Sequence, residues 1–157
     1  MTEPDPFEIV LYEPHYRPGV LTVVEQIHRE EGAEPFDPET EDDLRDVEAS
    51  YGPPDGKLLV AFFEGQVVGV GGICRVSETE CELRRLGVLA DFRRKGIATT
   101  LVGMLFDFVR ERGYRRVLLE REPHMDPQLR RYTRFGFEPV PPGDKLPRPG
   151  DFLALSF

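Results

Sequence analysis

Between residues 86 and 101 the chain reads Leu-Gly-Val-Leu-Ala-Asp-Phe-Arg-Arg-Lys-Gly-Ile-Ala-Thr-Thr-Leu. The pattern predicts a strand that ends near Val88, a loop with three consecutive basic residues, and an amphipathic helix that begins after Gly96. The first turn of a helix has backbone N–H groups without intrahelical partners and a partial positive charge, so it binds phosphate groups well. Gly96 lets an anion approach the backbone closely, because glycine has no side chain. We therefore expect this turn to bind a diphosphate.

Outward from this turn, apolar periodicity predicts strands and helices along the chain. The expected strands cover residues 7–12, 58–64, 66–76, 81–88, 117–120, 137–140 and 152–157. The expected helices begin at Pro18, at Thr40, just after Gly96 and at Asp126-Pro127, and they end at Gly32, Gly52, Gly113 and Gly136. Strands in series, followed by strands that alternate with helices, indicate a mixed sheet with helices packed on it. The expected fold class is therefore α/β, of the α+β kind.

Size and charge limit the kind of protein. A chain of 157 residues has the size of one domain, and we expect residues 1–157 to form a single one. No apolar run approaches the ~20 residues of a membrane span, and the N-terminus lacks the basic start of a secretory signal, so we expect a cytoplasmic protein without a membrane segment. The formal net charge of −9 argues against nucleic-acid binding.

The charge is unevenly distributed. Residues 1–60 contain 16 acidic and 4 basic residues, whereas residues 61–157 contain 13 acidic and 16 basic residues. This asymmetry suits a protein that binds an anionic cofactor on one side and attracts a cationic substrate on the other.

Several other features favour structural interpretations. Cys74 and Cys81 are too few for a disulfide framework and, with three scattered histidines, show no metal-ligand spacing, so we expect buried thiols and no metal. The glycines at 69, 71 and 72 lie inside a strand and indicate bending or close packing. The acidic run Glu39–Asp43 is interpreted as the solvated start of a helix.

Two motifs resemble the signature of the GNAT N-acetyltransferases. The segment Val88-Leu-Ala-Asp-Phe-Arg93-Arg-Lys-Gly96-Ile-Ala98 is similar to the acetyl-CoA loop of that family, and Tyr132-Thr-Arg-Phe-Gly136-Phe137 is similar to its Tyr, three residues, Gly-Phe ending. The resemblance covers roughly residues 58–140. It implies the GNAT fold, a mixed and mostly antiparallel sheet of about six to seven strands with about four helices, splayed between the fourth and fifth strands.

The resemblance also implies roles for particular residues. Tyr132 would protonate the departing CoA thiolate, which a phenol that is protonated at neutral pH can do, although a tyrosine here could also be a core aromatic residue. The loop, the helix start and the preceding strand would bind the CoA part of acetyl-CoA through Leu86, Val88, Arg93, Arg94, Lys95, Gly96, Ile97, Ala98 and Thr99.

A primary ammonium acceptor must lose a proton before its nitrogen can attack, so a base is expected. The candidates are Glu82, on the strand before the loop, and Glu120, at the end of the next strand. Ordinary ion pairs are the alternative interpretation. They would join Glu82 to Arg84 or Arg75, and Glu120 to Arg121 or Arg115.

The chain departs from the family pattern at four places, one of which is the missing alanine where Gln128 and Leu129 stand. Ala90 stands where members often have proline, Arg131 replaces an aliphatic residue, and His124-Met-Asp-Pro127 lacks an asparagine that is common there. These positions surround the acceptor and the thiol, so they bear on the acceptor more than on CoA binding. His124 itself is interpreted as a solvated loop residue.

Three functions are consistent with these observations. The first is an N-acyltransferase that moves an acetyl group from acetyl-CoA to a primary amine by direct attack in a ternary complex. Its acceptor would be a small-molecule amine or a protein or peptide amine. The second is a non-catalytic acyl-CoA-binding sensor. The third is a nucleic-acid or partner-binding protein with a basic patch at Arg84, Arg85, Arg93, Arg94 and Lys95. Pairing of the C-terminal strands between subunits leaves a homodimer open.

Overall fold

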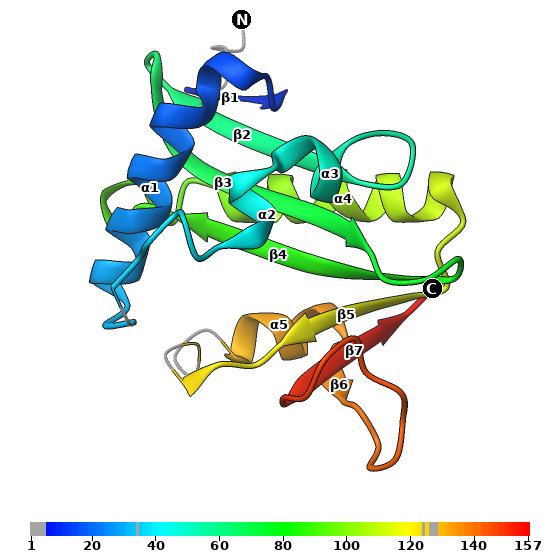
Figure 1. Cartoon of the computed structure of the whole chain (residues 1–157). Coiled ribbons are helices and arrows are strands. Elements are labelled where there is room, and N and C mark those ends of the chain that lie inside the picture. The colour runs from blue at the N-terminus through cyan, green and yellow to red at the C-terminus, as the bar shows by residue number, and fades with distance from the viewer. Residues whose placement is uncertain (1–5, 34, 124, 126–128) are drawn as a thin grey trace, which may run out of the picture.

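Seven strands form one sheet in the order β1-β2-β3-β4-β5-β7-β6 (Figure 1). The computed structural model describes residues 6–33, 35–123, 125 and 129–157. The strands are β1 (Phe7–Leu11), β2 (Lys57–Phe63), β3 (Gln66–Arg75), β4 (Glu80–Val88), β5 (Arg116–Glu120), β6 (Glu138–Pro139) and β7 (Phe152–Ser156). The helices are α1 (Arg17–Glu30), α2 (Asp42–Arg45), α3 (Val47–Tyr51), α4 (Ile97–Arg112) and α5 (Leu129–Phe135), with short 3-10 turns η1 (Pro14–Tyr16) and η2 (Ala90–Phe92). The expected mixed sheet with helices packed on it is confirmed.

Helices cover both faces of the sheet. Helices α1, α2 and α3 lie in front of it in the view of Figure 1, whereas α4 and α5 lie behind it. Two apolar clusters correspond to these two layers. Val20, Leu44 and Tyr51 belong to the cluster of the first face, and Leu105 and Tyr132 belong to the cluster of the second.

The sheet opens between β4 and β5. These strands pair in parallel only where Glu80–Glu82 meet Arg116–Leu118, and they then diverge, as Figure 1 shows. In β4 the pairing with β3 jumps from Arg84 to Gly87, and Arg85 has a φ of 62° at this bulge. A bulge bends a strand and re-aims its side chains. The expected splay between the fourth and fifth strands is therefore confirmed.

The glycines of β3 have the close packing that the sequence predicts. A Cβ on Gly72 would lie 2.5 Å from Cε1 of Tyr51, so the ring of Tyr51 requires a glycine here. Tyr51 in turn is buried and carries part of the site described below.

The sequence predicts one helix from Thr40 to Tyr51, and this prediction is wrong. The chain forms α2 and α3 instead, separated at Asp46, whose φ of −134° and ψ of 85° are not helical. The carboxylate of Asp46 accepts a hydrogen bond from the backbone N–H of Ala49 at 3.2 Å and caps α3. Aspartate competes with a continuous helix because its side chain bonds nearby backbone N–H groups.

Helix α5 ends before Gly136, which has a φ of 104°, as the sequence predicts. The expected cap at Asp126-Pro127 and the loop residue His124 lie outside the described residues. None of the helices in the described part of the chain has the length and apolar character needed to cross a bilayer.

Candidate active site

The N-terminus of α4 faces a small cavity of about 190 Å³, which we call the α4 cavity. Gly96 is the N-cap residue with a φ of 83°, and no side chain among the residues that the structure describes caps this helix start. The N–H groups of the first turn are therefore left for a ligand. The cavity is lined by Glu31, Gly87, Val88, Phe92, Arg93, Arg94, Gly96, Ile97, Ala98, Thr99 and Arg131. The structure thus brings most of the predicted CoA-binding residues around one hollow.

Two of the predicted loop cations are arranged differently from one another. The Nε of Arg93 donates to the backbone oxygen of Val88 at 3.1 Å, so part of this guanidinium holds the loop against the end of β4. The ammonium of Lys95 lies 5.4 Å from the ring centroid of Phe63, and Lys95 does not line the α4 cavity. Arg93 lines the α4 cavity, whereas the ammonium group of Lys95 lies beside Phe63.

Arg131 is a residue of this cavity that sequence reasoning missed. Because Arg131 directly precedes Tyr132, it is expected from the sequence to lie near the acceptor and the thiol. The structure places Arg131 among the residues that line the α4 cavity, together with Arg93 and Arg94. Three arginines and one glutamate, Glu31, therefore line this cavity, and their charges favour an anionic ligand.

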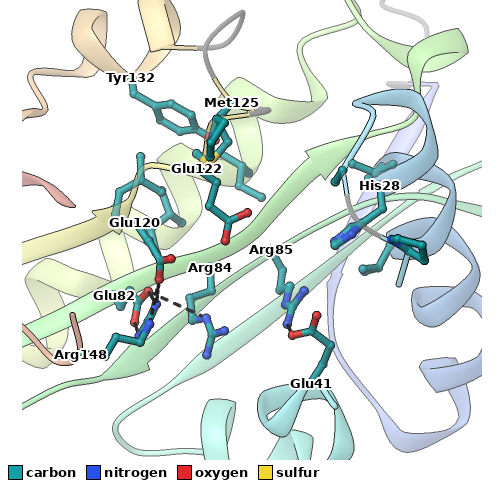
Figure 2. A pocket seen from close by; sticks show the side chains of 18 residues that line it. His28, Glu41, Glu82, Arg84, Arg85, Glu120, Glu122, Met125, Tyr132 and Arg148 are labelled. Atoms are coloured by element: carbon teal, nitrogen blue, oxygen red, sulfur yellow. Dashed lines mark hydrogen bonds and ion pairs between the residues drawn. The ribbon is translucent and has the colours of Figure 1, made fainter. Parts of the chain in front are cut away.

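A larger cavity of about 510 Å³ lies farther back along β4, and we call it the β4 cavity (Figure 2). It is lined by Val24, Ile27, His28, Ala33, Pro35, Glu41, Glu82, Leu83, Arg84, Arg85, Leu86, Leu119, Glu120, Glu122, Pro123, Met125, Tyr132 and Arg148. The predicted cofactor residue Leu86 lies here, whereas Val88 lies in the α4 cavity. The two cavities therefore follow each other along β4.

Tyr132 joins the β4 cavity from α5 (Figure 2). Its side chain is only 2% exposed, and its ring packs edge-on against Phe137 with centroids 6.1 Å apart. Burial raises the pKa of Tyr132 to about 12. The phenol is therefore protonated throughout the neutral range and can donate its proton within this cavity.

The two candidate bases, Glu82 and Glu120, meet at one arginine that the sequence analysis did not consider (Figure 2). Arg148 donates from Nη1 and Nη2 to the two oxygens of Glu82 at 3.0 and 2.6 Å, and from Nε to Oε1 of Glu120 at 2.8 Å. Glu82 is buried rather than at the surface. The expected ion pair with Arg84 is present but long, with Nε of Arg84 4.0 Å from Oε2 of Glu82, whereas Arg75 pairs with Asp55 and Glu78 instead.

For Glu120 the described residues show an ion pair with Arg148 in place of the expected partners Arg121 and Arg115. Arg148 is 66 residues from Glu82 and 28 from Glu120, so no local sequence pattern could indicate these pairs. Glu122 is a further carboxylate of the cavity that the sequence analysis missed.

A second ionic cluster supports the opposite wall of the β4 cavity. Asp43 is 2% exposed, and its carboxylate accepts from Arg85 Nε at 2.9 Å, from Arg85 Nη2 at 2.6 Å and from the hydroxyl of Tyr51 at 2.5 Å. Arg85 also donates to Glu41 at 2.8 Å. Burial alone would raise the pKa of Asp43, but the hydrogen bonds and charges of Arg85, with Arg84 and Tyr51, lower it to about 2.

This cluster corrects the interpretation of the acidic run Glu39–Asp43 as a solvated helix start, because Asp43 is buried and anchors α2 to β4. It also bears on the basic patch of the nucleic-acid alternative: the side chain of Arg85 is 10% exposed and paired with acids, so it does not belong to an exposed basic patch. Arg84 lies beside the same aspartate at 3.7 Å.

The cysteines behave as expected. Cys74 and Cys81 are free and buried, and burial raises their pKa values to about 11 and about 12. Both thiols therefore remain protonated near neutrality and are poor nucleophiles.

Comparisons with known proteins agree with this architecture. The model of the Acetyltransferase (GNAT) family matches residues 22–137. YjgM, an uncharacterised N-acetyltransferase of Escherichia coli (strain K12), is 30% identical over 128 residues, which are 78% of this chain and 77% of that protein.

Solved structures share the fold at lower identity. A GNAT-family acetyltransferase of Staphylococcus aureus Mu50 has a TM-score of 0.86 at 18% identity, covering 96% of this chain and 98% of its own. The PaiA N-acetyltransferase of Thermoplasma acidophilum, solved in complex with coenzyme A, has a TM-score of 0.74 at 16% identity, covering 96% of this chain and 99% of its own.

A sheet that splits at a parallel strand pair, with a helix that begins beside the bent strand, is thus the fold that this chain shares with solved acetyltransferases. The family match extends over more than half of the chain, and the chain belongs to the GNAT family of acetyltransferases. It is accordingly an enzyme of the N-acetyltransferase class.

Proposed function

We propose that acetyl-CoA binds along β4, with its diphosphate in the α4 cavity and its acetyl group in the β4 cavity. The observation that carries the proposal is the succession of these cavities along one bent strand. At one end, the N–H groups of Ile97–Thr99 and the guanidinium groups of Arg93, Arg94 and Arg131 suit a diphosphate. At the other end lies Tyr132.

The β4 side of the sheet opening supports the position of the pantetheine arm. No described residue of β5 pairs with residues 83–88, so their backbone groups on that side are left for a ligand. Strand addition of this kind recruits an extended chain with amide groups, which the pantetheine arm has. Leu86 and Val88 would then contact the arm, as the resemblance to the family implies.

The reaction is acetyl transfer to a primary amine by direct attack. The acceptor ammonium first gives one proton to a carboxylate of the β4 cavity, which frees the nitrogen lone pair. The nitrogen then attacks the thioester carbonyl carbon, the new C–N bond forms, and the C–S bond breaks. Tyr132 gives its proton to the thiolate and regains one from the product nitrogen, so no tyrosinate accumulates although its pKa is high.

The charges of the β4 cavity favour a cationic acceptor. Glu41, Glu82, Glu120 and Glu122 line it together with three arginines, Arg84, Arg85 and Arg148, and Asp43 lies directly behind. Each of these arginines already has a carboxylate partner. An incoming ammonium therefore meets an excess of acids, whereas an incoming carboxylate must displace one of them.

Two measurements test this function. Isothermal titration with acetyl-CoA should show binding to the full chain, and thiol release measured over a panel of primary amines should exceed background for at least one amine. Binding without thiol release for any amine would instead support the acyl-CoA sensor. Failure to bind acetyl-CoA at millimolar concentration would refute both.

A further inference from the structure

Arg148 reaches the β4 cavity from the loop between β6 and β7, and the backbone of this loop is held in place. A proline stands on each side of Arg148, which limits its backbone. Two contacts attach the loop to β5, one at the start of that strand and one just after its end. Arg116 pairs with Asp144 at 3.1 Å, and the backbone N–H of Arg121 donates to the oxygen of Asp151 at 2.7 Å. Arg148 is therefore presented by a fixed loop.

Arg148 makes different hydrogen bonds to the two candidate bases. Both oxygens of Glu82 accept from it, whereas only Oε1 of Glu120 does. Within the described residues, Oε2 of Glu120 accepts no hydrogen bond. The side chain of Glu82 is 5% exposed and that of Glu120 is 27% exposed. Glu120 thus keeps an oxygen for a ligand, and Glu82 does not.

Glu82 and Arg148 also form a wall. Both residues line the β4 cavity and a further cavity of about 560 Å³ on the side of α3, which we call the rear cavity. Their bidentate pair lies between the two spaces, together with Arg84. A carboxylate engaged in such a pair holds the wall in place rather than moving protons.

We propose that Arg148 is a positioning residue that fixes Glu120 as the proton acceptor, with Glu82 as its anchor. This assignment rests on the proposed acetyl transfer. The acceptor R–NH3⁺ gives one proton to Oε2 of Glu120, forming R–NH2 and the neutral acid, which returns the proton to solvent after transfer. Arg148 keeps Oε1 and aims the second oxygen at the ammonium.

The test compares two acceptors that differ only in whether they must lose a proton. One is the best alkylamine of the panel, and the other is the O-alkylhydroxylamine of the same chain length, which is neutral near pH 7. Glu120→Gln should lower kcat/KM by about 10²-fold with the alkylamine, and only severalfold with the hydroxylamine, because general-base catalysis is needed only for the former. A purely structural role for Glu120 would lower both rates equally.

Arg148 is tested by the same pair of acceptors. Arg148→Met should lower kcat about tenfold with the alkylamine, and Arg148→Lys should recover part of it, since lysine keeps the charge but not the fork. The double variant of Glu120→Gln and Arg148→Met should be no slower than Glu120→Gln alone, because one residue acts through the other. Lys145→Met, in the same loop and exposed, is the matched control.

Glu82→Gln separates the anchor from the base. Glu82→Gln should lower kcat with the alkylamine about as much as Arg148→Met does, and it should also lower the melting temperature. Glu120→Gln should leave the melting temperature unchanged. The inference is overturned if Glu82→Gln or Glu122→Gln shows the selective loss with the alkylamine and Glu120→Gln does not. It is overturned equally if the double variant is additive. If the wild-type chain releases no thiol with any amine, the proposed function itself fails, and this inference falls with it.

Discussion

At the scale of single residues, Tyr132 carries the chemistry that most of the account depends on. Tyr132→Phe should lower kcat by about 10²-fold while leaving the Kd for acetyl-CoA within about twofold of wild type, because the hydroxyl acts on the thiolate and not on the diphosphate. Steady-state kinetics and titration calorimetry measure the two effects. A tyrosine with only a packing role would instead lower the melting temperature and spare kcat.

Arg131 gives a prediction for the other cavity. Arg131→Met should weaken acetyl-CoA binding by about tenfold and reduce its salt dependence, since it removes one charged contact from the α4 cavity. Arg134→Met, an exposed arginine on the same helix that lines neither cavity, serves as the control. Equal losses of acetyl-CoA affinity for the two variants in calorimetric titrations would show that the overall charge of the protein, and not a contact in the α4 cavity, weakens binding.

Asp43 gives a prediction about pH. Its folded pKa of about 2 lies below the ordinary value of an aspartate, so its contribution to stability is present above about pH 4 and is lost as the pH falls toward 2. The lowered pKa corresponds to about 2 kcal/mol of unfolding free energy. Denaturant unfolding between pH 2 and 6 measures it. Asp43→Asn should remove this part of the pH dependence of the unfolding free energy. If the unfolding free energy of the variant still changed with pH as in the wild type, the role of the Asp43–Arg85 pair would be contradicted.

The sequence could locate the candidate bases but not their environment. Glu82 and Glu120 could be found because they lie on strands beside the motif. Their shared partner Arg148 could not, because it lies in a proline-rich loop whose path depends on the whole sheet. Arg131 could be read only as a departure from a pattern, since the cavity that a helical residue faces depends on how its helix packs.

At the scale of elements, a substitution at Gly72 of β3 tests how closely this strand packs against α3. Gly72→Ala should destabilise the fold by about 2 kcal/mol, because the new Cβ would meet Tyr51 at 2.5 Å and shift the tyrosine that bonds Asp43. Gly103→Ala is the matched control. It lies in α4 with no atom near its Cβ position and should be stabilising by up to about 1 kcal/mol.

Chemical denaturation of both variants supplies the comparison. Similar unfolding free energies for the Gly72 and Gly103 variants would show that Tyr51 can move away from the new Cβ without destabilising the fold.

Most elements followed from the sequence because their apolar residues repeat with the period of a helix or a strand. Helix α4 is the clearest case, with Leu101, Leu105 and Val109 buried on one stripe. The division of α2 from α3 did not follow. Leu44, Val47 and Tyr51 keep a helical spacing across Asp46, but that aspartate has a non-helical backbone and caps the next helix.

At the scale of the whole molecule, the opening of the sheet places both cavities. The bulge at Arg85 turns β4 away from β5, and the ion pairs of Arg85 with Asp43 and Glu41 tie that bulge to the N-terminal helices. The resemblance to a family predicted the splay, whereas apolar periodicity alone could not, because it does not report which strands lie side by side. The acidic N-terminal half therefore has a structural part in the site as well as an electrostatic one.

The most direct test of the account is a crystal structure of the chain with coenzyme A bound. We expect the diphosphate against the N–H groups of Ile97–Thr99, between Arg93 and Arg131, with the pantetheine arm along β4 and the sulfur beside Tyr132. An α4 cavity left empty at saturating coenzyme A, or a sulfur directed away from the phenol, would contradict it.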